Sequence, residues 1–493
     1  MNGRIARVAV GLGFVFVVSV GVIVAEGYRV GRPGYRVDNP TARMRPHTRH
    51  TDHSALVQGP FGDGPSVTKA CLKCHPSAAQ EVMATSHWSW LGQKTAIPEH
   101  GVHARIGKAN LINNFCIGVQ PNISHCTYCH AGYGWTDVSF DFKKQENVDC
   151  LICHDTTGSY RKDPDRGGIV AAGVDLVATA KKVGVPTRRN CGFCHFAGGG
   201  GDAVKHGDLD GTMFFPTERI DIHMGKLDFS CQQCHRTTHH NIPGRSMSVS
   251  VDDTNRVSCV DCHASAPHKD DRLNNHIKTV ACQTCHIPRM AIEAATKMSW
   301  DWSVAGHDPE PGTDPHLYSK KRGAFTFARN VAPEYYWYNG SADRYLTGDP
   351  IDPSQTTRIN YPRGNSRDPR ARIWPFKVHR GKQPYDQKNK YLLVPRTEGK
   401  EGFWDEFNWD KALRLGSEAT GLAYSGQYGF AATEMYWPLS HMVAGKEKAL
   451  QCVDCHGERG RLNWRALGYE GDPAFRGTRT PTLAADRDGE DAK

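Results

Sequence analysis

The chain has 493 residues, of which 39% are hydrophobic, and its formal net charge at pH 7 is +9. Length alone would suggest about three domains, and a basic balance alone would suggest a nucleic-acid partner. The 17 cysteines argue against three separate domains and exclude a nucleic-acid partner. Nearly all of them belong to one repeated motif, whose cofactor brings its own acidic groups.

The first 27 residues are predicted to be a signal peptide or an N-terminal membrane anchor. Arg4 and Arg7 precede an uncharged run of eighteen residues at positions 8–25. A run of this length just reaches a spanning helix and exceeds most signal-peptide cores, which favours an uncleaved anchor. A cleavable signal ending at Ala25 stays open, because small or aliphatic residues precede it. In both cases the positive charges keep the N-terminus inside, and the rest of the chain is exported.

Residues 28–69 are predicted to be a flexible tether between this segment and the folded body. They are rich in Gly, Pro, Arg and His and show neither a helical nor a strand period. We interpret the three histidines there, His47, His50 and His53, as solvated linker residues, with metal binding as the alternative.

The motif C-x-x-C-H then occurs eight times. In it, two thiols form thioether bonds to a haem, and the histidine becomes an iron ligand. Neither a zinc ribbon nor a disulfide framework would require a histidine after every second cysteine. The sequence therefore predicts eight covalently bound c-type haems as cofactors. The motifs are Cys71, Cys74 and His75; Cys126, Cys129 and His130; Cys150, Cys153 and His154; Cys191, Cys194 and His195; Cys231, Cys234 and His235; Cys259, Cys262 and His263; Cys282, Cys285 and His286; and Cys452, Cys455 and His456.

This cofactor content sets the compartment, the charge and the fold class. Covalent haem attachment predicts a periplasmic protein. Eight haems bring about sixteen propionate carboxylates, which offset the positive charge and exclude nucleic acid as a partner. Because haem macrocycles replace side-chain core, we expect one haem-packed body over residues 70–456, mainly α-helical with much irregular coil and few strands. Within it, the motif-free, aromatic-rich residues 287–451 are predicted to wrap the haems with short helices and loops. Residues 457–493 are predicted to be a polar, mostly exposed tail.

Eight of the 25 histidines belong to the motifs, which leaves many candidates for the second iron ligand. A haem with two histidine ligands transfers electrons but does not bind substrate, so the chemistry depends on which haem lacks the second histidine. His239 and His240 are adjacent, and the sequence does not separate them. The predicted second ligands are His87, His223, His239, His268, His276, His379 and His441.

Two stretches are candidates for chemistry. In residues 113–130, Cys116 is the one cysteine outside the motifs, and it stands ten residues before Cys126. A free thiol beside a haem is a candidate nucleophile, with an inert buried thiol as the alternative. The second stretch follows the fourth motif, where four glycines at positions 198–201 precede the polar residues Asp202, Lys205 and His206. Glycines permit close approach to a flat ring, whereas a flexible surface loop is the bland interpretation.

These stretches, NNFCIG and GGGGDAVKHGDLD, together with LNNHIKTVACQTCHIP, VHRGKQPYD and PLSHMVAGKEKALQCVDCH, resemble the octahaem tetrathionate reductase family. The resemblance covers roughly residues 70–456. It implies that the haem at the second motif is catalytic and that the Lys205 amine is its second ligand. It also implies that Asp202, Asn113 and Cys116 lie close by. The predicted anchor and tether depart from the soluble family pattern.

The resemblance predicts reduction of tetrathionate to thiosulfate. In this hypothesis Cys116 attacks a sulfur of tetrathionate as a thiolate, and two electrons then release the second thiosulfate. Lys205 and Asn113 would hold the sulfonate groups, and Asp202 would hold the displaced, protonated Lys205. The expected partners are a small inorganic oxyanion substrate and a quinol-linked or periplasmic cytochrome electron donor. The oligomeric state is left open.

Two alternatives stay open. One is nitrite or hydroxylamine reduction at the same haem. Dedicated pentahaem nitrite reductases use C-x-x-C-K, which this sequence does not contain, and hydroxylamine-oxidising octahaem enzymes use a tyrosine after the last motif, where Tyr469 lacks a supporting context. The other is a pure electron-transfer conduit, which predicts eight haems with two histidines each. Lys205 and Cys116 argue against the conduit.

Overall fold

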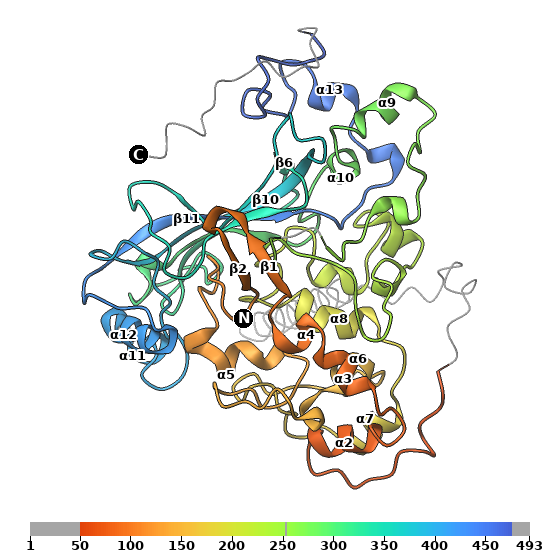
Figure 1. Ribbon diagram of the computed structural model, residues 1–493, viewed down its shortest axis with the longest axis vertical. Coiled ribbons are helices and arrows are strands. Elements are labelled where there is room, and N and C mark those ends of the chain that lie inside the picture. Colours follow the sequence, from red (N-terminus) through yellow and green to blue (C-terminus); the bar gives the residue numbers. More distant parts are fainter. Residues whose placement is uncertain (1–49, 252–253, 476–493) are drawn as a thin grey trace, which may run out of the picture.

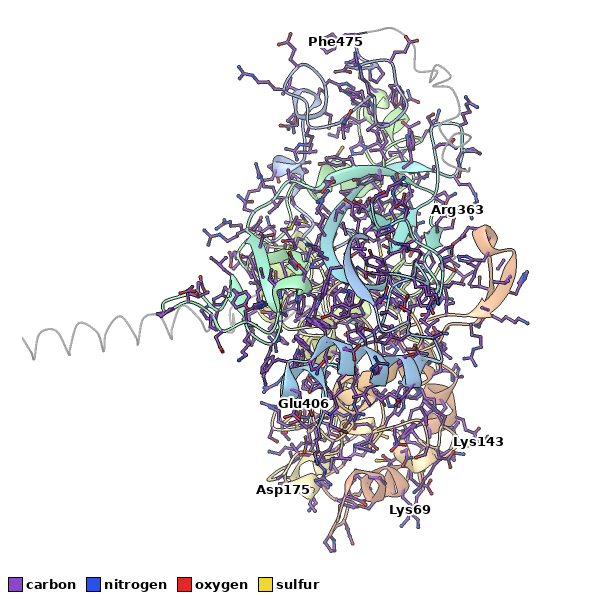
Figure 2. The ribbon with its side chains drawn as sticks, turned by 90° about the vertical axis from the view of Figure 1, so that its left-hand side faces the viewer. Lys69, Lys143, Asp175, Arg363, Glu406 and Phe475 are labelled. Atoms are coloured by element: carbon purple, nitrogen blue, oxygen red, sulfur yellow. The ribbon has the colours of Figure 1, made fainter. Side chains whose placement is uncertain are left out.

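The computed structural model describes residues 50–251 and 254–475 (Figure 1). The predicted signal or anchor at residues 8–25 and part of the tether lie outside these ranges. Within them, no helix combines the length and the apolar character that crossing a bilayer requires. The body is elongated, and Figure 2 shows Lys69, just before the first motif, and Phe475, after the last, at opposite ends of the long axis.

The helices are short because many of them serve to present a haem motif. A C-x-x-C spacing places two thiols on one face of a helical turn. The motifs accordingly lie on or beside α-helices or, for the second, fifth and sixth, in 3-10 turns at Thr127–Cys129, Cys231–Gln233 and Cys259–Asp261. The prediction of a mainly helical and irregular fold with few strands is confirmed. The α-helices are α2 (Gly64–Cys71), α3 (Ala78–Met83), α4 (Ser86–Ser89), α5 (Ile123–Cys126), α6 (Cys150–His154), α7 (Leu176–Lys181), α8 (Arg188–His195), α9 (Asp271–His276), α10 (Cys282–His286), α11 (Phe403–Glu406), α12 (Trp409–Thr420) and α13 (Cys452–Cys455).

The motif-free residues 287–451 differ from the predicted short helices and loops, because they form a seven-stranded sheet. Its order is β4-β5-β3-β10-β11-β8, with β6 also paired to β10. The central strand β10 is antiparallel to β11 and parallel to β3. The strands are β1 (Lys94–Ile97), β2 (Val102–Arg105), β3 (Thr296–Asp301), β4 (Tyr318–Ser319), β5 (Gly323–Ala328), β6 (Glu334–Tyr338), β7 (Ala342–Arg344), β8 (Thr357–Arg358), β9 (Asn360–Pro362), β10 (Arg372–Asp386) and β11 (Tyr428–Pro438).

The two parts of the body lie side by side in Figure 1. The motif helices follow one another from α2 and α6 at the lower end, through α8, to α10 and α13 at the upper end, while the sheet lies alongside them. The largest apolar cluster joins the sheet to residues 112–117. It packs Phe115 and Ile117 with Trp300 of β3 and Phe325 of β5, and Cys116 lies against it. The sheet therefore fixes the segment that carries the free thiol.

The described part of the predicted tail, residues 457–475, packs against the body. Leu462 and Leu467 are buried with Trp337 and Ile373, and Trp464 stacks on the motif histidine His456 with ring centroids 5.2 Å apart. The described part of the tail is therefore partly packed against the body, through its apolar residues, and partly exposed.

Candidate haem sites and catalytic centre

Seven of the eight motif histidines face a second imidazole. In each pair the ring centroids lie 6.0–6.3 Å apart, too far for ring stacking and too close to be separated by another side chain. The pairs, with the motif histidine second, are His53 and His75, His240 and His154, His87 and His195, His441 and His235, His223 and His263, His268 and His286, and His276 and His456.

This spacing fits an iron between the two rings. A midpoint about 3.1 Å from each centroid accommodates a metal–imidazole nitrogen bond of about 2 Å plus the ring's own radius. In several pairs the Nδ1 atom is already used: His154 donates to the Gly184 carbonyl (2.9 Å), and His235 donates to the Pro243 carbonyl (2.6 Å). Such bonds fix the ring and leave Nε2 for the metal. The residues present therefore fit haem iron with two histidine ligands.

The geometry corrects the predicted set of second ligands in three places. His240, and not His239, faces His154; the His239 side chain is 81% exposed. His53, interpreted from sequence as a solvated linker residue, faces His75. His379 is fully buried on β10, where its Nδ1 lies 3.0 Å from Asn114 Oδ1, and no motif histidine faces it among the described residues. The other five predicted second ligands face a motif histidine, as given above.

The motifs also contact one another. Thiols of different motifs are neighbours in four places, which link the first motif to the third, the second to the fourth, the fourth to the fifth and the sixth to the seventh. The second motif thus adjoins the fourth. The contacting thiols are Cys71 and Cys150, Cys129 and Cys194, Cys191 and Cys231, and Cys259 and Cys282.

His130 of the second motif is the exception to this pairing. In the described ranges no second imidazole faces it, and its ring is surrounded by aromatic side chains instead. It is fully buried, its Nε2 donates to the Trp88 carbonyl (2.6 Å), and its Nδ1 has no hydrogen-bond partner. One ring nitrogen is thus available to a metal. The five surrounding rings, with centroids 4.9–6.1 Å from that of His130, are Trp88, Trp90, Trp135, Phe140 and Phe142.

A tight turn positions the free thiol. Asn113 Oδ1 accepts from three successive backbone amides, those of Phe115 (3.1 Å), Cys116 (2.7 Å) and Ile117 (3.1 Å). Ile117, a β-branched residue, is held at φ +74°, a conformation that is strained for this residue type. Asn113 therefore fixes the backbone around Cys116, and its amide nitrogen remains available to a ligand.

The four-glycine loop approaches this turn closely. Gly199 and Gly200 have φ of +84° and +106°, values that favour glycine. A Cβ at Gly200 would lie 3.2 Å from Cys116 Sγ, and one at Gly199 would lie 3.2 Å from Lys205 Cδ. Close backbone approach is therefore why glycine is needed, and the loop brings Lys205 and Cys116 to one place.

A buried lysine holds the backbone of Lys205. Lys377 of β10 is fully buried, and its ammonium donates to the carbonyls of Val204 (2.7 Å) and Lys205 (3.3 Å) and to Thr296 Oγ1 (2.6 Å). Burial lowers the pKa of Lys377 well below its usual value, and nearby Asp208 opposes this shift. We identify Lys377 as the anchor of the loop that presents Lys205.

Asp202 does not lie where its expected role, holding the protonated Lys205, would require. It is exposed, and its Oδ1 accepts from the Gly211 amide (2.7 Å). Over the described residues it forms no ion pair with Lys205. The expectation that Asp202 holds the protonated Lys205 is therefore not met in this conformation.

Comparisons with known proteins agree with this geometry. A family model for bacterial cytochrome c matches residues 297–459. A solved structure of an octahaem cytochrome c from Shewanella oneidensis is 48% identical, covering 86% of this chain and 98% of that chain with a TM-score of 0.81. The chain belongs to the octahaem cytochrome c family. It therefore carries multiple covalently bound c-type haems. An uncharacterized protein from Archaeoglobus fulgidus is 20% identical over 231 residues, which is 37% of this chain and 77% of that protein.

The electrostatics of this octahaem cytochrome single out the Cys116 region. Burial raises the pKa of the Cys116 thiol, and the positive charges of Lys297, Lys108, Arg322 and Lys205 oppose that rise. Burial, and after it the charge of Lys108, lowers the pKa of Lys205 to about 8. Burial outweighs the cations, so the pKa of Cys116 is raised overall, and the cations limit that rise; the buried lysine amine is more easily deprotonated than one in water.

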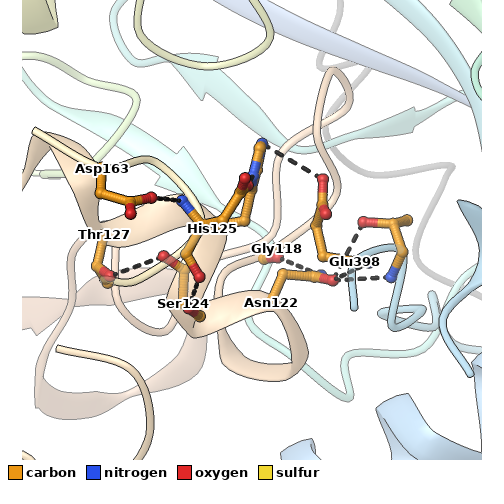
Figure 3. Close-up of polar contacts among 9 residues, drawn as sticks. Gly118, Asn122, Ser124, His125, Thr127, Asp163 and Glu398 are labelled. Atoms are coloured by element: carbon orange, nitrogen blue, oxygen red, sulfur yellow. Dashed lines mark hydrogen bonds and ion pairs between the residues drawn. The ribbon is translucent and has the colours of Figure 1, made fainter. Parts of the chain in front are cut away.

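The segment that leads into the second motif is bonded to residues 395–398 of the motif-free region (Figure 3). Asn122 donates to the carbonyls of Gly118 and Pro395, both at 3.0 Å, and its Oδ1 accepts from the Thr397 amide (2.7 Å). His125 Nε2 lies 3.3 Å from Glu398 Oε1. These contacts tie the α5 segment to residues 395–398 and hold the motif in register with the turn around Cys116.

Sequence reasoning missed three lysines at this centre: Lys377, Lys297 and Lys162. The Lys162 ammonium is buried, donates to the His130 (2.6 Å) and Gly132 (2.8 Å) carbonyls and pairs with Asp149 at 3.2 Å. Each lysine lies far along the chain from the segment that it contacts. The sequence around each lysine contains no recognisable motif. The one available signal was a lysine within an otherwise apolar run, residues 373–378, as at Lys377.

Proposed function

We propose that this octahaem cytochrome is an oxidoreductase that reduces tetrathionate to thiosulfate at the second haem motif. One observation carries the proposal. The motif of His130, the histidine without an imidazole partner in the described chain, adjoins Cys116 and Lys205, because its Cys126 interacts electrostatically with Cys116 and its Cys129 with Lys205. The haems, when bound, supply the electrons that the reduction consumes.

The remaining steps belong to side chains of this chain. Cys116 as a thiolate attacks one of the two central sulfurs of tetrathionate; the S–S bond breaks and thiosulfate leaves. Two electrons then split the bond between Cys116 and the remaining thiosulfonate group, which returns the thiolate and the second thiosulfate. The positive charges around Cys116 stabilise the thiolate and attract the dianionic substrate.

Two side chains position the reaction. Lys205 is the proposed second ligand of the iron held by His130, and an amine can leave when it takes up a proton. Asn113 holds the Cys116 backbone through Oδ1 and offers its Nδ2 hydrogens to a sulfonate oxygen. Asp202 is exposed beside the glycine loop. It would have to turn away from Gly211 to reach a protonated Lys205.

The seven imidazole pairs are proposed as electron-transfer haems. We further propose a periplasmic location and a quinol-linked or cytochrome donor, since a c-type cytochrome is assembled outside the cytoplasm. Anchoring through residues 8–25 remains part of this proposal.

The exception at His130 also favours a second candidate, reduction of nitrite or hydroxylamine, because a small nitrogen ligand needs only an iron with a displaceable partner.

The test is reductant-driven turnover of wild-type protein, Cys116→Ala and the nearly isosteric Cys116→Ser, each with eight haems verified by mass. We expect wild-type turnover of tetrathionate to fall at least about a hundredfold in both variants, because neither supplies a sulfur nucleophile. Equal turnover in all three would remove Cys116 from the mechanism. Turnover of nitrite or hydroxylamine without tetrathionate would favour the second candidate. Silence with all three substrates would favour an electron conduit.

A further inference from the structure

The positive charges around Cys116 fall into two groups. Lys205 interacts with Lys108 and with Cys116. Lys297 interacts with Arg322 and with Cys116. The Lys108 ammonium lies over the Trp90 ring, 3.9 Å from its centroid, whereas the Lys297 ammonium lies over the Trp300 ring, 3.7 Å from its centroid. The thiol is therefore the point at which two separate cationic groups meet.

Lys297 lies in an aromatic box without an anionic partner. It is on β3 and only 4% exposed, and its ammonium lies 3.6 Å from the Phe325 ring centroid, 3.7 Å from that of Trp300 and 5.3 Å from that of Phe327. Across the described ranges no carboxylate pairs with this ammonium. Burial lowers the pKa of Lys297 to about 7, and the nearby Cys116 opposes that shift. Buried charges are normally paired, and the aromatic faces offset only part of the desolvation cost. The ammonium thus has unused capacity for an anion.

Arg322 is the second cation of this group, and Trp300 connects it to the thiol. The Arg322 carbonyl accepts from Trp300 Nε1 (2.6 Å), and its guanidinium lies 5.5 Å from the Trp404 ring centroid with no carboxylate paired to it in the part of the chain described. The same Trp300 ring carries Lys297 on its face. Its edge lies 3.2 Å from the position of a Gly200 Cβ, as does Cys116 Sγ.

We infer that Lys297 and Arg322 form an anion subsite separate from Lys205 and Lys108, and that the centre accepts substrates with two anionic ends and a reactive sulfur–sulfur bond between them. One end lies on Lys297 and Arg322, the other lies on Lys205 and Lys108, and Cys116 faces the middle. This inference rests on the proposed function and names its substrate class, the polythionates. A small ligand without two anionic ends, such as hydroxylamine, would make no contact with Lys297 and Arg322.

The test compares Lys297→Met and Arg322→Gln with wild-type protein, using tetrathionate and hydroxylamine as probes. The matched control is Lys320→Met, which removes a charge from the same turn as Arg322 but is paired with Asp308 at 2.7 Å. We expect each subsite variant to raise the KM for tetrathionate about tenfold, as the loss of one charge-assisted contact predicts. The ratio of kcat/KM for tetrathionate to that for hydroxylamine should fall with it, and Lys320→Met should behave as wild type.

An unchanged ratio in both subsite variants, with eight haems present, would overturn the inference. If Lys297→Met does not fold, Arg322→Gln and the charge-preserving Lys297→Arg test the subsite instead. Arg322→Gln should raise the KM for tetrathionate, whereas Lys297→Arg should keep a near wild-type KM. A wild-type protein that does not reduce tetrathionate contradicts the proposed function itself, whereas tetrathionate turnover equal in all variants contradicts only the subsite.

Discussion

The seven imidazole pairs and the second motif use the same five-residue haem-attachment motif, but they differ in what lies opposite the motif histidine. In each pair a second histidine faces the motif histidine at about the same spacing, whether it comes from the adjacent segment, as His53 does, or from a distant one, as His441 does. At the second motif, aromatic rings surround His130, and lysine and arginine side chains gather beside it around a thiol. In the proposed function, what distinguishes an electron-transfer haem site from the catalytic one is therefore the residue opposite the motif histidine, and not the motif.

The comparison also shows how differently the two regions are stabilised. Several of the paired histidines are fixed by a hydrogen bond at Nδ1, as in His154, His235 and His456, whose Nδ1 lies 2.6 Å from Asp472. The second motif is held by buried lysines that bond backbone carbonyls, Lys162 at His130 and Lys377 at Lys205. Burying these two lysines is costly, and the cost is offset by the carbonyls that they bond and, for Lys162, by the ion pair with Asp149.

The largest effect should come from removing the side chain that makes the second motif different. Lys205→Leu deletes both the proposed iron ligand and a charge near Cys116. We expect tetrathionate turnover to fall by about a hundredfold or more, comparable to the loss of an electrostatic catalytic group. Reductant-driven kinetics measure this, with the exposed Lys182→Met as control. Turnover within about twofold of wild type would show that the two regions do not differ in the way described.

A smaller effect is expected at the support of the Lys205 loop. Lys377→Met leaves the Val204 carbonyl and Thr296 without their buried donor, which should cost about 2–3 kcal/mol of stability. Thermal unfolding of the haem-loaded protein measures it. Lys382→Met, an exposed change on the same strand, is the control. An unchanged midpoint would mean that water or a shifted side chain replaces Lys377.

The smallest effect on turnover should come from turning a paired site into an open one. His53→Ala removes the partner of His75, while His50→Ala removes an exposed neighbour whose ring lies 5.0 Å from His53. We expect the first variant to bind one additional equivalent of carbon monoxide when reduced and to keep most tetrathionate turnover, because the proposed reaction takes place at the second motif and not at the first. The second variant should bind as wild type does. Equal binding by both would remove His53 from the haem site.

The two attachment cysteines and the motif histidine of every haem site could be predicted because they lie within five contiguous residues. The second ligands depend on folding at longer range. His53 lies in a stretch without any period, where composition indicates only a linker. His239 and His240 both have positive φ, +47° and +58°, so the local turn decides which ring points inward. His379 resembles a ligand in sequence but is a buried strand residue bonded to Asn114.

The sheet was missed for a related physical reason. β10 is buried continuously from residue 373 to residue 379, so the alternation that marks a half-exposed strand is absent. At the candidate centre, Cys116, Asn113 and Lys205 come together as the resemblance implied, while Asp202 turns to Gly211. Lys297 and Lys377 could not be found, since only the fold brings their strands to the glycine loop.

The central claim is that one haem site, at the second motif, differs from seven that have two histidines. The most direct measurement is the number of carbon monoxide molecules bound by the fully reduced, haem-loaded protein, determined by titration of its absorption spectrum. The account predicts one equivalent per chain, bound where the Lys205 amine is displaced. No binding, or binding of two or more equivalents to wild-type protein, would contradict it.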